Sequence, residues 1–204
     1  PVLHGNRGLS RKGGAPGQAS YYSTLTRLSS QGTLNLGNET FTVTGSSWMD
    51  HEFSSNVLST DQIGWDWMGL QLSGNRELML YILRRKDGSI DPFSSGTLVR
   101  QDGSSVHLPK EAFVIKPKDF WESKASGARY PSGWQVDILP LGISLHVTPN
   151  LKNQELMTPQ STQVTYWEGS VKVKGTAHGE MVTGSGYVEL TGYAGEFELT
   201  PQEK

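Results

Sequence analysis

The residues best suited to chemistry lie in two short segments, Trp-Met-Asp-His-Glu-Phe at 48–53 and Gly-Trp-Asp-Trp-Met-Gly at 64–69. Successive side chains of an extended strand point to opposite faces. In the first segment, Asp50 and Glu52 therefore share the face of Trp48.

His51 is a candidate proton shuttle, or a group that orients the acids on either side of it. It projects with Met49 and Phe53, so a buried histidine with satisfied hydrogen bonds is an equally weighted alternative. Neighbouring side chains on a strand cannot chelate one ion together, and the chain has no cysteine. The sequence therefore predicts no metal site and no other cofactor.

Asp66 shares its strand face with Met68 and Leu70, which makes it a carboxyl group on an apolar stripe. Burial raises the pKa of a carboxyl group, as a general acid that works near neutral pH requires. The same surroundings suit a carboxylate that accepts hydrogen bonds at a strand end. The residues alone favour this structural role.

Trp65 and Trp67 share a face with Gly69 and Gln71, and form either a stacking wall for an apolar ligand or ordinary aromatic core. If they form a wall, the mechanistic hypothesis is that Asp66 protonates an alkene. The faces of the tryptophans, including Trp48, would then stabilise the developing positive charge.

A second polar cluster lies near the end of the chain. Tyr166 and Glu168 share one strand face with Trp167 opposite, and Tyr187 shares a face with Glu189 on the following strand. These side chains either donate to a ligand or form cross-strand hydrogen bonds, and the residues favour the structural role.

Strands must position these side chains, because short segments of alternating polarity are separated by many of the 24 glycines and 10 prolines. We expect strands at residues 33–36, 40–44, 47–53, 64–72, 77–85, 96–100, 134–138, 143–148, 163–173 and 182–193. Asp-Gly pairs at 87–88 and 102–103 suit hairpin turns. Residues 118–122 are the expected helical piece, and residues 1–20 are expected to form a loop or a tethering arm.

An internal repeat indicates the domain organisation, because Val-Thr-Gly-Ser occurs both at residues 43–46 and at residues 182–185. Matching the two copies aligns Trp48 with Tyr187, and Asp50 with Glu189. Each copy predicts one hairpin, and the two hairpins are expected to be equivalent.

If each copy closes one barrel, residues 1–55 are the end of an incomplete N-terminal barrel and residues 56–204 are a complete C-terminal barrel. Strand 77–85 supports this division, because both of its faces are apolar and need cover. The predicted fold class is therefore all-β, built from antiparallel barrels. The N-terminal barrel or an oligomer partner is expected to cover part of the surface.

Composition excludes several classes of function. The 18 basic and 20 acidic residues offer no basic surface for nucleic acid. The longest apolar run, residues 78–83, is too short for a transmembrane segment. The start of the chain lacks the apolar core of a signal peptide and begins with proline, from which we expect a processed or trimmed product. Signature motifs of serine hydrolases, P-loop proteins and zinc proteases are absent from the sequence.

Five motifs carry a family resemblance: Gly-Ser-Ser-Trp-Met-Asp-His-Glu-Phe-Ser at 45–54, Gly-Trp-Asp-Trp-Met-Gly-Leu-Gln-Leu at 64–72, Glu-Leu-Met-Leu-Tyr at 77–81, Tyr-Trp-Glu-Gly at 166–169 and Gly-Tyr-Val-Glu-Leu-Thr-Gly-Tyr at 186–193. In these motifs the chain resembles the AttH-like, carotenoid 1,2-hydratase (CrtC) family. The resemblance implies two consecutive lipocalin-like barrels, in agreement with the repeat. Phe53 stands where hydratase-type members commonly have tryptophan, which favours the AttH-like exported branch.

The resemblance implies a protein that encloses an apolar small molecule, isoprenoid or acyl-like, with acid-assisted hydration, hydrolysis or rearrangement as its chemistry. A non-catalytic carrier and an envelope-associated binding module are the alternatives, so the sequence leaves open whether the protein is an enzyme. A periplasmic or secreted location is also implied. By position, the implied catalytic residues are Asp50, His51, Glu52 and Asp66. The side chains expected to bind the ligand are Trp48, Trp65, Trp67, Tyr81, Trp167 and Tyr187.

Overall fold

The computed structural model describes residues 1–54 and 58–195, most of which lie in β-strands. The strands are β1 (Val2–Leu3), β2 (Leu9–Arg11), β3 (Ala19–Leu36), β4 (Glu39–Ser54), β5 (Gln62–Leu72), β6 (Arg76–Arg85), β7 (Ser95–Val99), β8 (Ser105–Pro109), β9 (Phe113–Pro117), β10 (Phe120–Glu122), β11 (Arg129–Pro131), β12 (Trp134–Ile138), β13 (Ile143–Pro149), β14 (Glu155–Met157), β15 (Thr165–Ala177) and β16 (Glu180–Leu190). Two 3-10 turns, η1 (Lys110–Ala112) and η2 (Leu139–Leu141), are the helical segments of the described residues.

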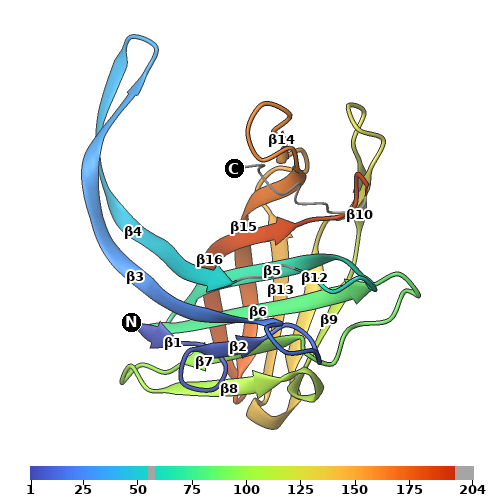
Figure 1. Cartoon of the computed structure of the whole chain (residues 1–204). Coiled ribbons are helices and arrows are strands. Elements are labelled where there is room, and N and C mark those ends of the chain that lie inside the picture. The colour runs from blue at the N-terminus through green and yellow to red at the C-terminus, as the bar shows by residue number, and fades with distance from the viewer. Residues whose placement is uncertain (55–57, 196–204) are drawn as a thin grey trace.

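The N-terminal residues form a four-stranded antiparallel sheet. Its strands are ordered β1–β3–β2, and β4 pairs with β3 to form a long hairpin. Gly37 has a φ of 59° at the hairpin tip, a left-handed conformation that glycine adopts without strain. The hairpin curves away from the rest of the molecule toward its tip (Figure 1).

Ten of the remaining strands form an antiparallel sheet that curls into a large, nearly closed barrel, while β10 and β11 pair in a separate two-stranded sheet (Figure 1). Its order is β8–β7–β6–β5–β16–β15–β13–β12–β9, with β14 paired to β15. The two end strands, β8 and β9, are joined by the short turn η1. This architecture confirms the all-β antiparallel barrel expected from the alternating sequence pattern.

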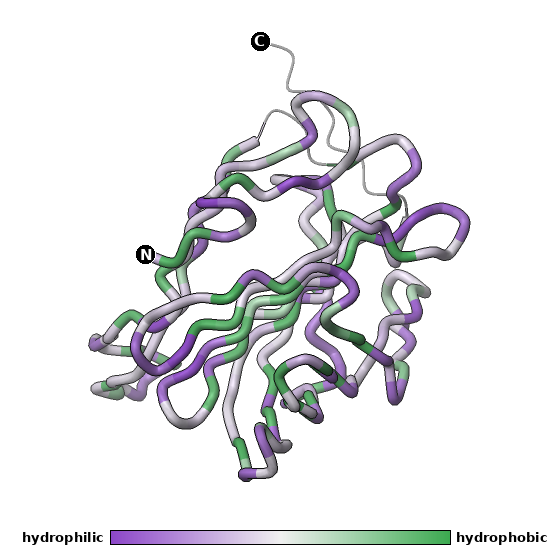
Figure 2. The backbone as a smooth tube through the Cα atoms, turned by 90° about the horizontal axis from the view of Figure 1, so that it is seen from below, coloured by the Kyte–Doolittle hydropathy of each residue, from purple (hydrophilic) through white to green (hydrophobic). Residues whose placement is uncertain are grey.

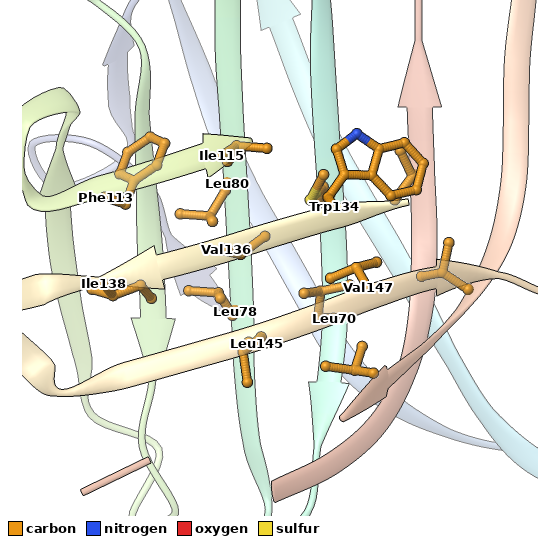
Figure 3. Close-up of a cluster of buried hydrophobic side chains, with 14 of the residues drawn as sticks. Leu70, Leu78, Leu80, Phe113, Ile115, Trp134, Val136, Ile138, Leu145 and Val147 are labelled. Carbon is orange, nitrogen blue, oxygen red and sulfur yellow. The ribbon is translucent and has the colours of Figure 1, made fainter. Parts of the chain in front are cut away.

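The barrel interior is filled by buried apolar side chains from both halves of the sheet (Figure 3). Leu78 and Leu80 of β6 point inward and meet side chains of β12 and β13. Trp134 and Trp167 pack edge to face in this interior, with ring centroids 5.9 Å apart. Hydrophobic stretches run along neighbouring strands, whereas many of the turns are hydrophilic (Figure 2).

The outer face of β6 is also buried, as the two-sided apolar pattern predicts. Met79, Tyr81 and Leu83 form a second cluster with Tyr22 of β3. His4 fastens the N-terminal segment to the barrel, because its two ring nitrogens lie 2.8 Å from the Thr97 hydroxyl of β7 and 2.6 Å from the Thr24 hydroxyl of β3. The cover over β6 thus comes from the first residues of this chain.

Two sequence expectations about local structure are wrong. Residues 1–20 include β1, β2 and the start of β3 rather than forming a plain loop, since polar side chains such as Ser10 are buried there through hydrogen bonds. Residues 118–122 contain strand β10 rather than a helix, because β10 pairs with β11. In both places tertiary pairing outweighs local preference.

One face of the β3–β4 hairpin is apolar and exposed, and we refer to it as the hairpin's apolar face. Cross-strand pairing places Tyr21 opposite Phe53 and Leu34 opposite Phe41. Its large exposed side chains are Tyr21, Leu34, Leu36, Phe41, Val43, Met49 and Phe53.

None of the helical turns among the described residues has the length and apolarity to cross a membrane.

Candidate functional site

A cavity of about 580 Å³ lies between the β3–β4 hairpin and the outer face of the barrel. It is lined by Lys12, Ser20, Tyr22, Trp48, Asp50, Glu52, Phe53, Ser54, Trp65, Trp67, Tyr81, Leu83, Glu168, Tyr187 and Glu189. The barrel contributes to this lining with alternate residues of its strands, while the residues between them, such as Met68 and Val188, belong to the interior core. The cavity is therefore outside the barrel, whose interior is packed with side chains.

The tryptophan wall of the cavity is shaped by a glycine on β5. The Trp67 ring lies over Gly69, where an added Cβ would come within 2.4 Å of the indole. The same Cβ would lie 3.2 Å from Trp48, which meets Trp67 edge to face with ring centroids 5.9 Å apart. The Trp-x-Gly spacing of the sequence thus leaves room for the indole to lie against the strand.

Asp50 is held by three hydrogen-bond donors. The hydroxyl of Tyr22 donates to Oδ2 at 2.7 Å, while the hydroxyl of Thr24 and the indole Nε1 of Trp48 donate to Oδ1 at 2.6 and 2.8 Å. Pairing of β3 with β4 places Thr24 directly opposite Asp50. These donors fix the orientation of the carboxyl group toward the cavity.

Tyr22 links Asp50 to the tryptophan wall, since its hydroxyl accepts a hydrogen bond of 2.9 Å from the indole Nε1 of Trp67. Burial, followed by the charge of Asp50 and the hydrogen bond to it, raises the pKa of Tyr22 well above its usual value. Tyr22 therefore keeps its proton and remains a donor to Asp50.

Glu52 lies on the same face of β4 as Asp50 and forms a second polar group of the wall. Its Oε1 accepts a hydrogen bond of 2.5 Å from Ser20 and lies 3.0 Å from the ammonium of Lys12. That ammonium also lies 4.0 Å from the centre of the Tyr81 ring. Lys12 is thus positioned by both an ion pair and an aromatic face.

On the barrel side, Glu168 of β15 and Glu189 of β16 are directly opposite each other in the strand register. The indole Nε1 of Trp65 donates to Glu189, and Tyr187 lines the cavity together with both glutamates. Burial, followed by repulsion from Glu189, raises the pKa of Glu168 to about 7. Burial also raises the pKa of Glu189, against the hydrogen bonds from Trp65 and Glu168.

Sequence comparison identifies the family of this chain. The profile of the AttH-like family matches residues 1–193. The chain belongs to the AttH-like family. Kievitone hydratase of Fusarium solani subsp. phaseoli is 26% identical to this AttH-like chain over 147 residues, which are 71% of the chain and 40% of the relative.

Solved structures agree with the family assignment. A protein from Nitrosomonas europaea, described in its crystal structure as an AttH, is 34% identical and superposes with a TM-score of 0.86, over 94% of this chain and 58% of its own. Kievitone hydratase of Nectria haematococca superposes with a TM-score of 0.75 over 95% of this chain and 58% of its own; at 20% identity it shows the fold alone. The AttH-like chain thus spans between 40% and 58% of the length of these relatives. None of these three is named a carotenoid 1,2-hydratase, and that part of the expectation stays untested.

Most of the side chains expected to bind a ligand line the cavity of this AttH-like chain: Trp48, Trp65, Trp67, Tyr81 and Tyr187. Trp167 does not. It is fully buried in the barrel interior, where its Nε1 donates to the Lys152 carbonyl at 2.8 Å. The reason is strand alternation, which turns Trp167 inward between the outward-facing Tyr166 and Glu168.

Asp66, the expected general acid, does not line the cavity. It is buried on the inner side of β5, where Arg84 Nε lies 2.9 Å away and the Tyr193 hydroxyl donates to it at 3.0 Å. Burial raises the pKa of Asp66, while the charge of Arg84 and the hydrogen bond from Tyr193 oppose that rise. Because Asp66 alternates with Trp65 and Trp67, the structure separates this acid from the tryptophan wall.

His51 is also outside the cavity lining, whereas its neighbours Asp50 and Glu52 are part of it. The His51 side chain is exposed and meets Phe53 edge to face, with ring centroids 5.7 Å apart. The structure therefore brings together two of the four residues that the family resemblance marks as catalytic.

The sequence did not single out Lys12, Ser20 or Tyr22 as site residues, and it favoured a structural role for Glu168. Lys12 and Ser20 fall in the segment expected to be a loop, and Tyr22 lies just beyond it. The signal for the barrel-side acids was the repeat, which aligns Glu189 with Asp50. In the structure, the β3–β4 and β15–β16 hairpins both contribute these matched acids to one cavity. Within residues 1–54 and 58–195, no three His, Asp or Glu side chains are grouped to hold a metal ion.

Proposed function

We propose that the cavity binds an apolar, alkene-bearing small molecule and catalyses the addition of water to it. The observation that carries this proposal is the combination of an indole wall with carboxyl groups on both sides of one cavity. Water addition to an alkene requires a proton donor, stabilisation of positive charge on carbon, and a group that accepts a proton from the attacking water.

The aromatic wall supports the charge-stabilising part of this proposal. Trp48, Trp65 and Trp67 each donate their indole N–H to a neighbouring oxygen, namely those of Asp50, Glu189 and Tyr22. The rings are therefore fixed before a ligand arrives. Electron-rich ring faces attract a cation, and this attraction strengthens as positive charge develops in the transition state.

Asp50 is suited to receive the proton of the attacking water. Its orientation is set by Tyr22, Thr24 and Trp48, so little reorganisation is needed when the proton moves. A hydratase role also agrees with the named activity of a relative, kievitone hydratase, although the chain spans only 40% of that protein. The activity of the whole protein is therefore part of the proposal.

The experiment is to incubate the purified protein with kievitone and a set of isoprenoid alkenes in ¹⁸O-labelled water, and to detect hydrated products by mass spectrometry. Wild-type protein should incorporate the label. Asp50→Asn should reduce turnover by about 10²- to 10⁴-fold, the usual contribution of one acid–base group. Asp137→Asn is the matched control, because Asp137 also accepts hydrogen bonds from two side chains but lies outside the cavity lining.

A non-catalytic carrier is the competing role, and the open hairpin side of the cavity, where Asp50, Glu52 and Phe53 are exposed, is compatible with it. A carrier would quench its tryptophan fluorescence with the same alkenes but would incorporate no label. Binding without incorporation across the whole set would therefore contradict the hydratase proposal.

A further inference from the structure

Two glutamates of the cavity wall, Glu168 and Glu189, occupy directly opposite positions on β15 and β16. Like charges in opposite positions on neighbouring strands repel each other. Both side chains are partly buried, so water screens the repulsion only in part. Two carboxyl groups at such a site are most stable when they hold one proton between them.

The hydrogen bonds around the two glutamates fit a single shared proton. A carboxyl group can donate a hydrogen bond to the carboxylate opposite it only when it is protonated, so contact between Glu168 and Glu189 requires a proton on one of them. The indole N–H of Trp65 donates to Glu189 and stabilises the charged form of that carboxyl group, so the proton resides on Glu168. The same hydrogen bond from Trp65 holds the Glu189 carboxylate in place.

The charged groups that face this pair do not compensate a second negative charge. Asp50 and Glu52 of β4 raise the pKa of Glu189 by repulsion. Lys12, the basic member of the described cavity lining, is ion-paired with Glu52. The nearby phenols have raised pKa values and stay neutral around pH 7: Tyr22, Tyr166 and Tyr187.

We propose that Glu168 and Glu189 share one proton and that Glu168 donates this proton to the bound alkene. The inference rests on the proposed function. In the step, the O–H bond of Glu168 breaks as the π-electrons of the alkene form a C–H bond, which leaves a cationic carbon. The oxygen of one water molecule bonds to that carbon, and the proton it releases passes to the Asp50 carboxylate. Return of this proton to Glu168 through solvent completes the cycle, so one alkene and one water yield one alcohol.

The shared proton is tested first in the free protein, with ¹³C-labelled glutamate and carboxyl NMR titration. Glu168 should titrate near pH 7 in the wild type, whereas exposed glutamates titrate near their ordinary pKa of about 4.3. Glu189→Gln should lower the midpoint of Glu168 by at least about one pH unit, because it removes the charge repulsion and the acceptor of the shared proton. Glu180→Gln is the matched control on the same β15–β16 hairpin, since Glu180 is exposed and outside the cavity lining.

The donor role is tested by turnover with the alkenes in labelled water. Glu168→Gln keeps the side-chain volume and should lower turnover by about 10²- to 10⁴-fold, while tryptophan quenching by the ligand persists. Turnover by the wild type should fall as pH rises through about 7, and in Glu189→Gln this fall should occur at lower pH. Circular dichroism checks that the variants remain folded.

Each outcome distinguishes the inference from the proposed function. Two glutamates that both titrate at ordinary values would overturn the shared proton even in a protein that hydrates alkenes. Wild-type turnover in Glu168→Gln would overturn the donor role. If Glu168 and Glu189 share a proton but the protein turns over none of the alkenes, both the donor role and the proposed function are wrong. The sharing of a proton in the free protein would still hold.

Discussion

Asp66 shows how a single strand position separates two roles that the same residue type can have. It lies between Trp65 and Trp67 in sequence, yet its carboxyl group bonds Arg84 and Tyr193 on the other side of the strand. Arg84 in turn lies 3.9 Å from the centre of the Tyr193 ring. These three residues form a polar unit around the buried Asp66, and none of them belongs to the cavity lining.

Replacing Asp66 by Asn should therefore affect stability and not ligand chemistry. The variant keeps the volume of the side chain but leaves Arg84 without its charged partner, which should lower the free energy of unfolding by about 1–3 kcal/mol. Urea unfolding measures this loss, and tryptophan quenching should give an unchanged ligand affinity. Loss of turnover at full stability would instead restore Asp66 as the acid.

Gly69 sets the position of the tryptophan wall, so a single methyl group should reshape the cavity. In Gly69→Ala, the added Cβ would meet the Trp67 ring at 2.4 Å, and the indole must shift to remove the overlap. We expect ligand affinity to fall about tenfold, which corresponds to roughly 1.4 kcal/mol.

Gly45→Ala is the control for this substitution, because Gly45 also lies in a strand and nothing lies within 4 Å of an added Cβ there. Fluorescence titration with an isoprenoid alkene measures both affinities. Equal affinities in the two variants would show that the position of the Trp67 ring over Gly69 does not determine ligand binding in the cavity.

Residue alternation explains how much of this site could be read from the sequence. It correctly placed Asp50 and Glu52 on one face of β4 with Trp48, and all three line the cavity. Alternation also separates Asp66 from Trp65, so the expected cooperation of these two residues conflicted with the pattern itself. Contacts between distant segments, such as Tyr22 with Trp67, depend on how the hairpin docks and leave no local pattern.

At the scale of elements, the β3–β4 hairpin has two faces with different surroundings. Near the barrel, one face carries Tyr22 and Asp50 into the cavity, whereas the hairpin's apolar face is exposed. Large contiguous apolar surfaces on a protein usually mark a contact with another partner or domain. We propose that residues 1–55 are the end of a first barrel, that this chain is part of a longer protein, and that the remainder of the first barrel covers the apolar face there.

This proposal predicts that the apolar face contributes to stability only in the longer protein. Phe41→Ser should leave the stability of the present chain unchanged within about 0.5 kcal/mol, as for exposed sites generally. In the full-length protein the same change should cost about 1.5–3 kcal/mol, because a buried aromatic side chain is lost. Thermal unfolding of both proteins measures the difference.

Thr42→Ser is the control for this prediction, since Thr42 is on the opposite face of the same strand by alternation. An equal effect of Phe41→Ser in both proteins would mean that the apolar face stays uncovered.

The sequence predicted strands correctly where apolar side chains are buried and polar ones are exposed. It failed where polar side chains are buried. The strand expected at 134–138 matches β12, and the one at 77–85 differs from β6 by one residue. By contrast, β1 and β2 pair with β3 through a segment that contains buried His4 and Ser10. Their hydrogen bonds, to Thr97 and Tyr81 among others, replace the apolar contacts that a sequence pattern detects.

At the scale of the whole molecule, the buried His4 and the partly buried Glu168 give the stability opposite dependences on pH. Burial, followed by the positive charges of Lys12 and His107, lowers the pKa of His4 from 6.5 to about 3. His4 is therefore neutral when folded, and its contribution to stability is present above pH 6.5 and is lost as pH falls toward 3. Glu168 has a pKa raised from 4.5 to about 7, so its protonated form is favoured by folding. Its contribution is present below pH 4.5 and is lost as pH rises through about 7.

Between pH 4.5 and 6.5 the two contributions change in opposite directions and partly cancel. In Glu168→Gln this position no longer ionises, so the variant does not lose stability as pH rises. The free energy of unfolding of the variant, relative to that of the wild type, should therefore increase steadily from pH 4.5 to 7. His4→Asn should show the reverse trend: its free energy of unfolding should fall furthest below that of the wild type near neutral pH, and less so as the medium becomes acidic.

The two residues lie in different parts of the chain, so their effects should add in the double variant, as expected for residues without shared partners. Urea unfolding at several pH values measures all four proteins, and parallel profiles for the wild type and Glu168→Gln would show that Glu168 titrates with an ordinary pKa.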